Sequence, residues 1–270
     1  MEIEVSTPKI SVVIPSFNQA GYLGQTLDSV LAQRYSNLEL IVIDGGSKDD
    51  SVEILRRYAP HLSYWVSEPD QGQTHALIKG FAHASGEIFC WLNSDDLFEP
   101  GTLAEVVDFF TRNPQADAVF GDAIWIDAEG QLLRHQREIP FNRFLWLYTY
   151  NYIPGMSMFW RREIYDRTGG LNPDFNLAMD ADLWIRFADI GQIGHVRRFW
   201  SRVRFYPEQK NRRLRASSNI EDQRIRVRYW GCESPPFYRM KKVLALAMRV
   251  AWKLVTGCYT ISYKRHLDRL

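Results

Sequence analysis

The chain has 270 residues, 46% of them hydrophobic, which suits one large domain or one domain with an appendage and argues against disorder. Its three cysteines are widely spaced and odd in number, which argues against a disulfide framework or a zinc site with paired ligands. The sequence opens without a signal segment and has no run of about eighteen apolar residues, so we expect a cytoplasmic protein without an ordinary spanning helix.

The net charge of +1 hides a strong polarity along the chain. Residues 1–196 carry 14 Lys and Arg against 27 Asp and Glu, whereas residues 197–270 carry 19 against 5. Such a polarity is typical of an acidic body with a basic tail that meets an anionic surface, either a membrane or a nucleic acid.

Short β-branched segments alternate with helical patterns in the first part of the chain. Residues 10–14 and 38–43 predict buried strands, and the helical spacing of apolar residues predicts helices near residues 20–31 and 52–58. Glycines follow the second strand and let the backbone turn sharply close to a ligand. This alternation indicates βαβ units, so we expect an α/β fold with a Rossmann-like, mostly parallel sheet flanked by helices.

A pair of adjacent carboxylates follows the next predicted strand. Residues 62–66 predict a third strand and residues 74–84 a helix, and the apolar strand near residues 88–92 then runs into Asn93-Ser94-Asp95-Asp96. Adjacent acids at the carboxyl edge of a sheet stay ionised together most easily beside a hard divalent cation, which predicts a site for Mg²⁺ or Mn²⁺. The alternative is a turn whose Asp caps the helix expected at residues 102–112.

The second half of the chain offers two further candidate regions. After a strand at residues 118–122 and a hairpin, residues 141–152 are rich in aromatic side chains. They predict either a helix packed on the sheet or a platform for a sugar ring or an apolar acceptor. A helix opening near Asn176 carries Asp180 and Asp182 in its first turn, where the helix dipole favours a carboxylate, so either could serve only as a cap.

Basic residues dominate the remaining sequence, and residues 240–258 predict a basic amphipathic helix. Its apolar stripe comprises Val243, Ala247, Val250, Leu254 and Cys258, and the opposite face comprises Lys242, Arg249 and Lys253. We expect this helix to lie on the inner face of an anionic membrane; the alternative is a helix folded back onto the preceding domain. Because the apolar stripe is continuous, membrane contact ranks above nucleic-acid binding, and no nucleic-acid partner is expected.

Four segments of the chain together resemble glycosyltransferase family 2. They are Val12-Val13-Ile14-Pro15-Ser16-Phe17-Asn18, Asp44-Gly45-Gly46-Ser47-Lys48-Asp49, Leu92-Asn93-Ser94-Asp95-Asp96 and Met179-Asp180-Ala181-Asp182-Leu183. Members of this family are inverting enzymes with the GT-A fold that use nucleotide-activated sugars. The resemblance covers roughly residues 8 to 210 and implies a GT-A catalytic domain over residues 1–210, followed by a basic amphipathic helical extension over residues 211–270.

The resemblance also implies roles for individual residues. Asp180 matches the base that deprotonates the acceptor hydroxyl, and Asp95 matches the carboxylate that joins Mg²⁺ or Mn²⁺ to the diphosphate. The expected nucleotide and donor contacts are Pro15, Ser16, Phe17, Asn18, Asp44, Gly45, Gln71, Gly72, Gln73, Lys79, Asn93, Ser94 and Asp95. The expected acceptor contacts are Trp146, Tyr152, Gly155, Met156 and Asp182. The donor nucleotide commonest in the family is UDP, and a glycan or a lipid-linked molecule, as in polysaccharide assembly, would supply the acceptor hydroxyl.

The chain departs from the family pattern in places. Asn93 stands where relatives often have Asp, and Tyr206 stands where they often place a His two residues after an Arg, which leaves a third metal or phosphate contact open. The Gln-x-x-Arg-Trp signature of processive synthases is missing, so we expect a single-addition transferase.

Other classes of protein fit the sequence less well. A sugar-1-phosphate nucleotidyltransferase would need a Gly-rich, Arg-containing loop after the first strand, and a Rossmann dehydrogenase would need G-x-G-x-x-G there. A non-catalytic nucleotide-sugar-binding protein remains an alternative, although both Asp95 and Asp180 are present.

Overall fold

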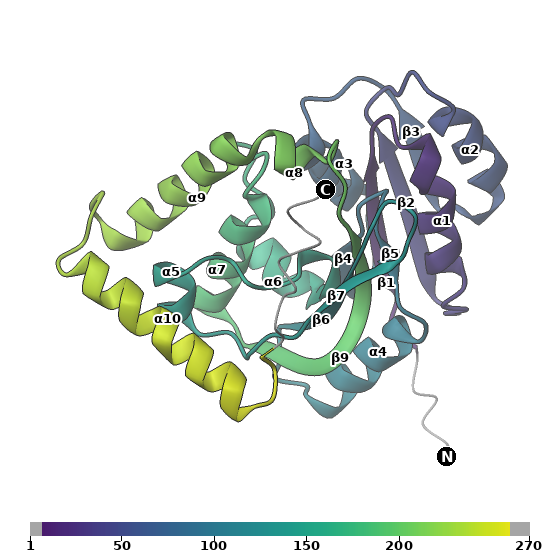
Figure 1. The fold of residues 1–270 in the computed structure, drawn as a ribbon. Helices are drawn as coiled ribbons and strands as arrows, with labels where there is room; N and C mark the ends of the chain where they lie inside the picture. Colours follow the sequence, from purple (N-terminus) through teal and green to yellow (C-terminus); the bar gives the residue numbers. More distant parts are fainter. Residues whose placement is uncertain (1–6, 260–270) are drawn as a thin grey trace, which may run out of the picture.

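A single mixed sheet flanked by helices organises the molecule (Figure 1). The computed structural model describes residues 7–259, and within them nine strands join in the order β3-β2-β1-β4-β8-β6-β9-β5, with β7 also paired to β6. The strands are β1 (Ile10–Ser16), β2 (Leu38–Asp44), β3 (Tyr64–Ser67), β4 (Ile88–Trp91), β5 (Leu97–Phe98), β6 (Ala118–Ile126), β7 (Leu132–Gln136), β8 (Met158–Arg161) and β9 (Ile193–Arg204).

The helices follow the strands in alternation through the first half and then accumulate at the end of the chain. They are α1 (Ala20–Leu31), α2 (Ser51–Tyr58), α3 (Gln73–His83), α4 (Thr102–Arg112), α5 (Arg143–Tyr148), α6 (Arg162–Arg167), α7 (Met179–Ile190), α8 (Lys210–Arg213), α9 (Arg215–Trp230) and α10 (Tyr238–Val255). Two short 3₁₀ turns, η1 (Ala59–His61) and η2 (Gly155–Ser157), complete the set described.

The N-terminal half of the sheet is the parallel βαβ arrangement that the sequence predicts. β1 pairs in parallel with β2 and β4, and β2 pairs in parallel with β3. The interior residues of β1 and β2 are fully buried, as expected for strands covered on both faces. The register places Ser16 beside Asp44 and Asp44 beside Ser67, so the loops that follow these strands meet at one edge of the sheet.

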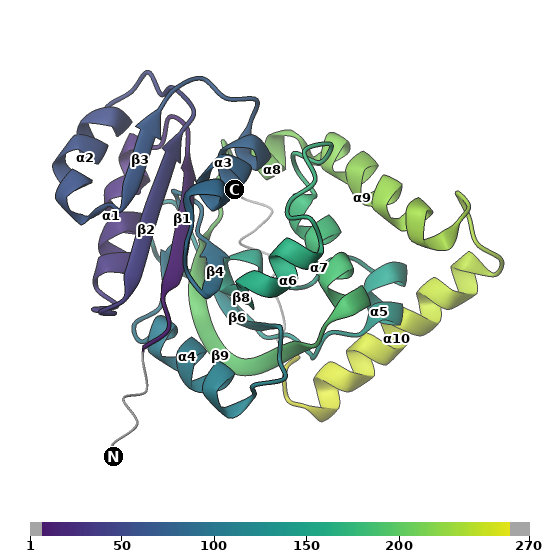
Figure 2. The ribbon, with the colours of Figure 1, turned by 180° about the vertical axis from the view of Figure 1, so that it is seen from behind.

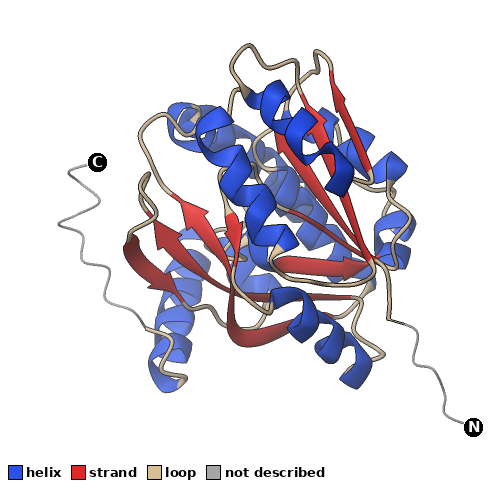
Figure 3. Cartoon of the chain, turned by 90° about the vertical axis from the view of Figure 1, so that its right-hand side faces the viewer, coloured by secondary structure: helices blue, strands red, loops and turns tan. Residues whose placement is uncertain are grey.

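The second half of the sheet is mixed, which corrects the expectation of a mostly parallel sheet. In the described part of the chain, four of the eight strand pairings are parallel and four are antiparallel. The antiparallel partners include β5 and β8, which have two and four residues and leave little periodic signal in the sequence. The sheet twists strongly between its halves (Figure 3), and the long strand β9 pairs with β6 through two register shifts.

The last two helices form an arm that projects from the sheet (Figure 2). α9 contacts α7, and α10 packs back against α5, which is the folded-back alternative for the basic helix. The helix turns much of its predicted apolar stripe toward solvent. Arg249 of the predicted basic face is buried against the body, whereas Val243 and Leu254 of the predicted apolar stripe are exposed. Among residues 7–259, every helix is too short or too polar to span a bilayer.

Candidate functional site

A cavity of about 840 Å³ opens at the carboxyl ends of β1, β2 and β4. Ten of the predicted donor residues line it, namely Pro15, Ser16, Phe17, Asn18, Gly45, Gly72, Gln73, Asn93, Ser94 and Asp95. Tyr206, where the sequence left a third metal or phosphate contact open, also lines it. The sequence prediction did not include the other lining residues, which are Gln19, Tyr22, Asp70, Ala76, Glu208, Gln209, Lys210, Arg213 and Leu214. Open α/β sheets bind ligands at this edge, because the loops after neighbouring parallel strands converge there.

The loop after β1 is fixed to the loop after β2. Asn18 adopts a positive φ of 52°, and its side-chain Oδ1 accepts a hydrogen bond from the Lys48 backbone N–H at 2.8 Å. The Asn18 backbone N–H donates to the Ser47 hydroxyl at 2.7 Å. The preceding Phe17 is held on this loop with 58% of its surface exposed, so its ring is free to lie against a planar ligand.

Asp44 lies behind the cavity rather than in its wall. It is fully buried, and its carboxylate accepts hydrogen bonds from the Ser47 backbone N–H at 2.9 Å and from the Ser67 hydroxyl at 2.7 Å. These bonds shape the turn that presents Gly45. The carboxylate that lines the cavity at this position is the half-buried Asp70, so close to Gly45 that a Cβ there would meet Asp70 Oδ2 at 2.8 Å.

Two other predicted donor residues lie outside the cavity lining. Lys79 of α3 forms an ion pair with Glu68, and Gln71 accepts a hydrogen bond from Asn176 Nδ2 through its backbone carbonyl at 3.1 Å. Gln73 does line the cavity, and its Nε2 donates to Asn93 Oδ1 at 2.7 Å.

The adjacent carboxylates after β4 occupy different environments. Asp96 is fully buried, accepting hydrogen bonds from the Arg204 backbone N–H at 2.8 Å and from Asn93 Nδ2 at 3.0 Å. Asp95 faces the cavity, where Tyr206 donates its hydroxyl to Asp95 Oδ2 at 2.9 Å. Burial raises the pKa of both acids, and the charge of Asp95 raises that of Asp96 further. A cation at Asp95 would therefore relieve an unfavourable concentration of negative charge.

The donor atoms around Asp95 fit a divalent cation that the protein binds through few ligands. Across the described chain, no group of three or more His, Cys, Asp or Glu side chains is placed to hold a metal. Mg²⁺ is usually bound by one or two carboxylates together with substrate phosphates and water, rather than by a cage of protein ligands. Asp95 fits that role because it is the carboxylate of the pair that lines the cavity.

Tyr206 and the residues after it form the other wall of the cavity. The Tyr206 hydroxyl accepts a hydrogen bond from Gln19 Nε2 at 3.3 Å, and burial raises the pKa of Tyr206 far above its usual value, so it remains a neutral donor to Asp95. Lys210 and Arg213 of α8 bring positive charge to this wall. The sequence signal for them was their position four and seven residues after Tyr206, within a basic run.

Asp180 is not among the residues that line the cavity, and the turn η2 lies against both Asp180 and the lining residue Asn93. The Asn93 backbone N–H lies 3.1 Å from Met156 Sδ, and a Cβ on Gly155 would lie 3.7 Å from Asp180 Oδ2. The Asp180 carboxylate accepts hydrogen bonds from Asn151 Nδ2 at 2.9 Å and from the Ala181 backbone N–H at 2.7 Å. Burial nevertheless raises the pKa of Asp180 to about 6, so desolvation outweighs the helix dipole that was expected to favour the charged form.

The remaining predicted acceptor residues are distributed through the core. Asp182 is fully buried and forms ion pairs with Arg186 at 2.7 Å and Arg228 at 3.0 Å. Trp146 and Tyr152 are also buried, and the Tyr152 hydroxyl donates to the Pro140 carbonyl at 3.1 Å. Gly155 and Met156, by contrast, stand between Asn93 and Asp180.

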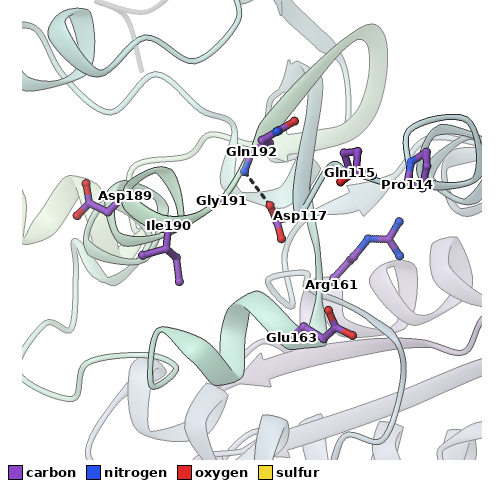
Figure 4. A pocket seen from close by; sticks show the side chains of 9 residues that line it. All are labelled: Pro114, Gln115, Asp117, Arg161, Glu163, Asp189, Ile190, Gly191 and Gln192. Atoms are coloured by element: carbon purple, nitrogen blue, oxygen red, sulfur yellow. Dashed lines mark hydrogen bonds between the residues drawn. The ribbon is translucent and has the colours of Figure 1, made fainter.

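A second hollow of about 780 Å³ lies away from this site, between the ends of α4 and α7 and the start of α6 (Figure 4). Its lining includes no predicted site residue, and its central charged groups bind the backbone. Asp117 accepts a hydrogen bond from the Gln192 N–H at 2.8 Å, and Arg161 Nε donates to the Ala116 carbonyl at 3.0 Å. These bonds fasten the strand ends, so both charged groups serve the fold.

Comparisons with known proteins agree with the fold and the motifs. An uncharacterized glycosyltransferase of Mycobacterium tuberculosis (strain ATCC 25618 / H37Rv) is 36% identical over 185 residues, covering 68% of this chain and 70% of the relative. Staphylococcus aureus TarS 1-349, solved with UDP-GlcNAc, superposes with a TM-score of 0.62 at 17% identity, covering 74% of this chain and 60% of that chain, which is less than two thirds of it.

A second solved structure covers more of the molecule. The mannosyltransferase PcManGT from Pyrobaculum calidifontis, in complex with GDP-Man and Mn²⁺, has a TM-score of 0.63 at 20% identity and covers 98% of this chain and 80% of that one. These likenesses identify the GT-A fold. Residues 11–171 match the profile described as Glycosyl transferase family 2. The chain belongs to glycosyl transferase family 2.

Proposed function

We propose that the protein is an inverting, metal-assisted glycosyltransferase. It would move a sugar from a nucleotide diphosphate sugar, most simply a UDP-sugar, to a hydroxyl of a glycan or of a lipid-linked acceptor in polysaccharide assembly. The observation that carries the proposal is the placement of two carboxylates on either side of η2. Asp95 lines the cavity at the strand ends, and Asp180 lies beyond Gly155 and Met156.

The two carboxylates are suited to different tasks. Asp180, with a pKa of about 6, is ionised at neutral pH yet basic enough to accept a proton from an acceptor hydroxyl. Inversion in a single displacement needs one base on the face opposite the leaving group, and Asp180 is the candidate. Asn151 orients its carboxylate through a hydrogen bond of 2.9 Å.

On the donor side, Asp95 would hold the cation and Phe17 would lie against the base. A divalent cation bound there supplies charge neutralisation to the departing diphosphate. Lys210 and Arg213 on the same wall add positive charge near the phosphates, and Tyr206 holds Asp95 in position through its hydroxyl. Structures of relatives in the same fold with UDP-GlcNAc and with GDP-Man and Mn²⁺ support this assignment of donor class and ion.

The proposal also includes a domain boundary and a location at the membrane. Residues 1–210 would form the catalytic domain and residues 211–270 an extension that contacts an anionic membrane peripherally from the cytoplasmic side. The exposed apolar face of α10 supports that contact.

A panel of nucleotide sugars, scored by thermal stabilisation with and without Mn²⁺, tests the proposed donor and ion together, because a ligand bound by the native state raises its stability. We expect one nucleotide class to stabilise the wild type only when Mn²⁺ is present, and Asp95→Asn to lose that dependence. The matched control is Asp108→Asn, which changes an exposed acid on α4. Equal stabilisation in excess EDTA would contradict a role for the metal.

A further inference from the structure

The outward face of α10 is almost entirely apolar. Twelve of its eighteen residues are exposed, and only two of these, Arg239 and Lys242 near the start of the helix, are charged. The other ten exposed residues are Met240, Val243, Leu244, Leu246, Ala247, Met248, Val250, Ala251, Leu254 and Val255. A contiguous apolar face of this length on the surface of a protein marks a site of interaction.

The inward face of the same helix is anchored by charge. Glu138 is buried, and its carboxylate forms ion pairs with Arg249 at 2.6 Å and with Lys253 at 2.9 Å. Arg249 also binds the Tyr150 hydroxyl, and its guanidinium lies 5.1 Å from the centre of the Tyr152 ring. Because a buried carboxylate needs these cations, the helix is held with Arg249 and Lys253 facing inward and most of its apolar residues facing outward. This is the reverse of an ordinary amphipathic helix on a water-soluble domain.

We infer that the apolar face of α10 is a docking surface for an anionic lipid bilayer, on which the helix lies parallel to the membrane plane. The charge around the face favours lipid over a protein partner. Among the described residues after Glu233 there is no Asp or Glu, and the exposed charged residues of α10 are the cations Arg239 and Lys242, with Lys241 partly exposed. A helix with an uninterrupted apolar face and only basic charge at its rim suits the boundary between acyl chains and anionic headgroups.

The inward face of the helix that carries this docking surface is linked to the proposed base, so the inference rests on and extends the proposed function. Arg249 of α10 binds Tyr150, and the next residue, Asn151, donates its side-chain amide to Asp180. A lipid-linked acceptor held in the same bilayer would therefore be presented beside the segment that orients Asp180. The acceptor class that follows is a lipid-anchored glycan rather than a freely diffusing one.

Flotation of the full chain with vesicles, without any sugar donor, tests the docking surface. We expect binding to vesicles of phosphatidylglycerol and phosphatidylcholine, and about a tenfold or larger fall in the partition coefficient for Leu244→Glu or Leu254→Glu. The matched control is Ile220→Glu, which places the same charge on an equally exposed side chain of α9 and should leave binding unchanged. Lys242→Gln should lower binding by only a few fold, and that loss should disappear at high salt.

Several results would overturn the inference. They are a wild type that ignores anionic vesicles, a Leu244→Glu protein that binds as well as wild type, and a wild-type dimer in light scattering that Leu244→Glu converts to a monomer. The last result would mean that a second copy covers the face. Thermal stabilisation by nucleotide sugar, measured on the same proteins, separates the two proposals. If the protein binds a nucleotide sugar but does not float with vesicles, only the docking-surface proposal fails. If it floats with vesicles but binds no nucleotide sugar, only the transferase proposal fails.

Discussion

Replacing Asp180 with Asn should stabilise the protein at neutral pH while abolishing most of its proposed activity. Burial raises the folded-state pKa of Asp180 from 3.8 to about 6. A carboxyl group whose pKa is raised on folding favours the native state below about pH 4, and that contribution is lost as the pH rises through about 6. The difference of about two pH units corresponds to about 3 kcal/mol of destabilisation in the ionised form.

The Asn variant removes this charge but keeps the shape of the side chain. One of the two bonds from Asn151 and Ala181 loses its acceptor oxygen, which costs about 1 kcal/mol, so the net gain at about pH 8 is about 1–2 kcal/mol. The advantage of the variant over wild type should shrink by about 2 kcal/mol between about pH 8 and pH 4.5. Transfer should fall by about 10²–10⁴-fold, the usual contribution of a general base.

Asp182→Asn provides the contrast, because the two acids are neighbours on α7 with opposite environments. Asp182 is buried between Arg186 and Arg228, so its neutralisation leaves two cations without their partner and should lower the free energy of unfolding by about 2 kcal/mol or more. Urea unfolding of both variants followed by tryptophan fluorescence measures the two effects. If Asp180→Asn proves as destabilising as Asp182→Asn at neutral pH, Asp180 is a structural residue and the reasoning about its desolvation is wrong.

Four further outcomes follow from the site and the fold. The wild-type transfer rate should rise with pH through about 6, as Asp180 loses its proton, and a flat profile from pH 5 to 8 would argue against it as the base. Phe17→Ala should weaken nucleotide binding about tenfold in calorimetry with little change in stability, because the ring is largely exposed. Gly72→Ala should destabilise more than Gly101→Ala, by about 1 kcal/mol or more in urea unfolding. Both glycines have positive φ, but only at Gly72 would a Cβ meet a neighbouring side chain, at 2.5 Å. Glu138→Gln should lower the unfolding free energy by about 3 kcal/mol, since it leaves the cations of α10 unpaired, and an unchanged urea midpoint would contradict the anchoring role.

Local patterns in the sequence were sufficient for the parallel half of the fold. The strands of residues 10–14 and 38–43 are short runs rich in apolar and β-branched residues, and such runs predict buried parallel strands because both of their faces are covered. The mixed half was not predictable in this way. β5 and β8 are short and are held by partners distant in sequence, so their structure depends on tertiary pairing rather than on periodicity.

The residues of the candidate site show the same difference between what local sequence patterns predict and what tertiary structure determines. Residues that directly follow the parallel strands, such as Phe17 and Asp95, line the cavity as expected, because the strand ends determine where they lie. Lys210 was missed because α8, which carries it, reaches the cavity through the tertiary fold, whereas Asp70 was passed over beside the predicted Gln71 in the loop after β3. Asp44 was expected to contact ligand, but its serine partners enclose it behind Gly45, and a linear motif does not show which acid of a loop is enclosed.

The basic end and the acidic body of the chain form ion pairs with each other in the folded protein. These pairs weaken the electrostatic argument for membrane contact. Four of the basic residues after residue 196 pair with acids of the preceding body, as Arg202–Glu99, Arg228–Asp182, Arg249–Glu138 and Lys253–Glu138. Cations already paired inside the protein contribute little attraction to an anionic surface, so net charge alone overstates the electrostatic pull of the tail. Exposed apolar surface, unlike charge, is not neutralised by ion pairs within the protein. The ten apolar residues that α10 turns toward solvent therefore carry the case for the bilayer, and the basic rim at Arg239 and Lys242 sets only its preference for anionic lipid.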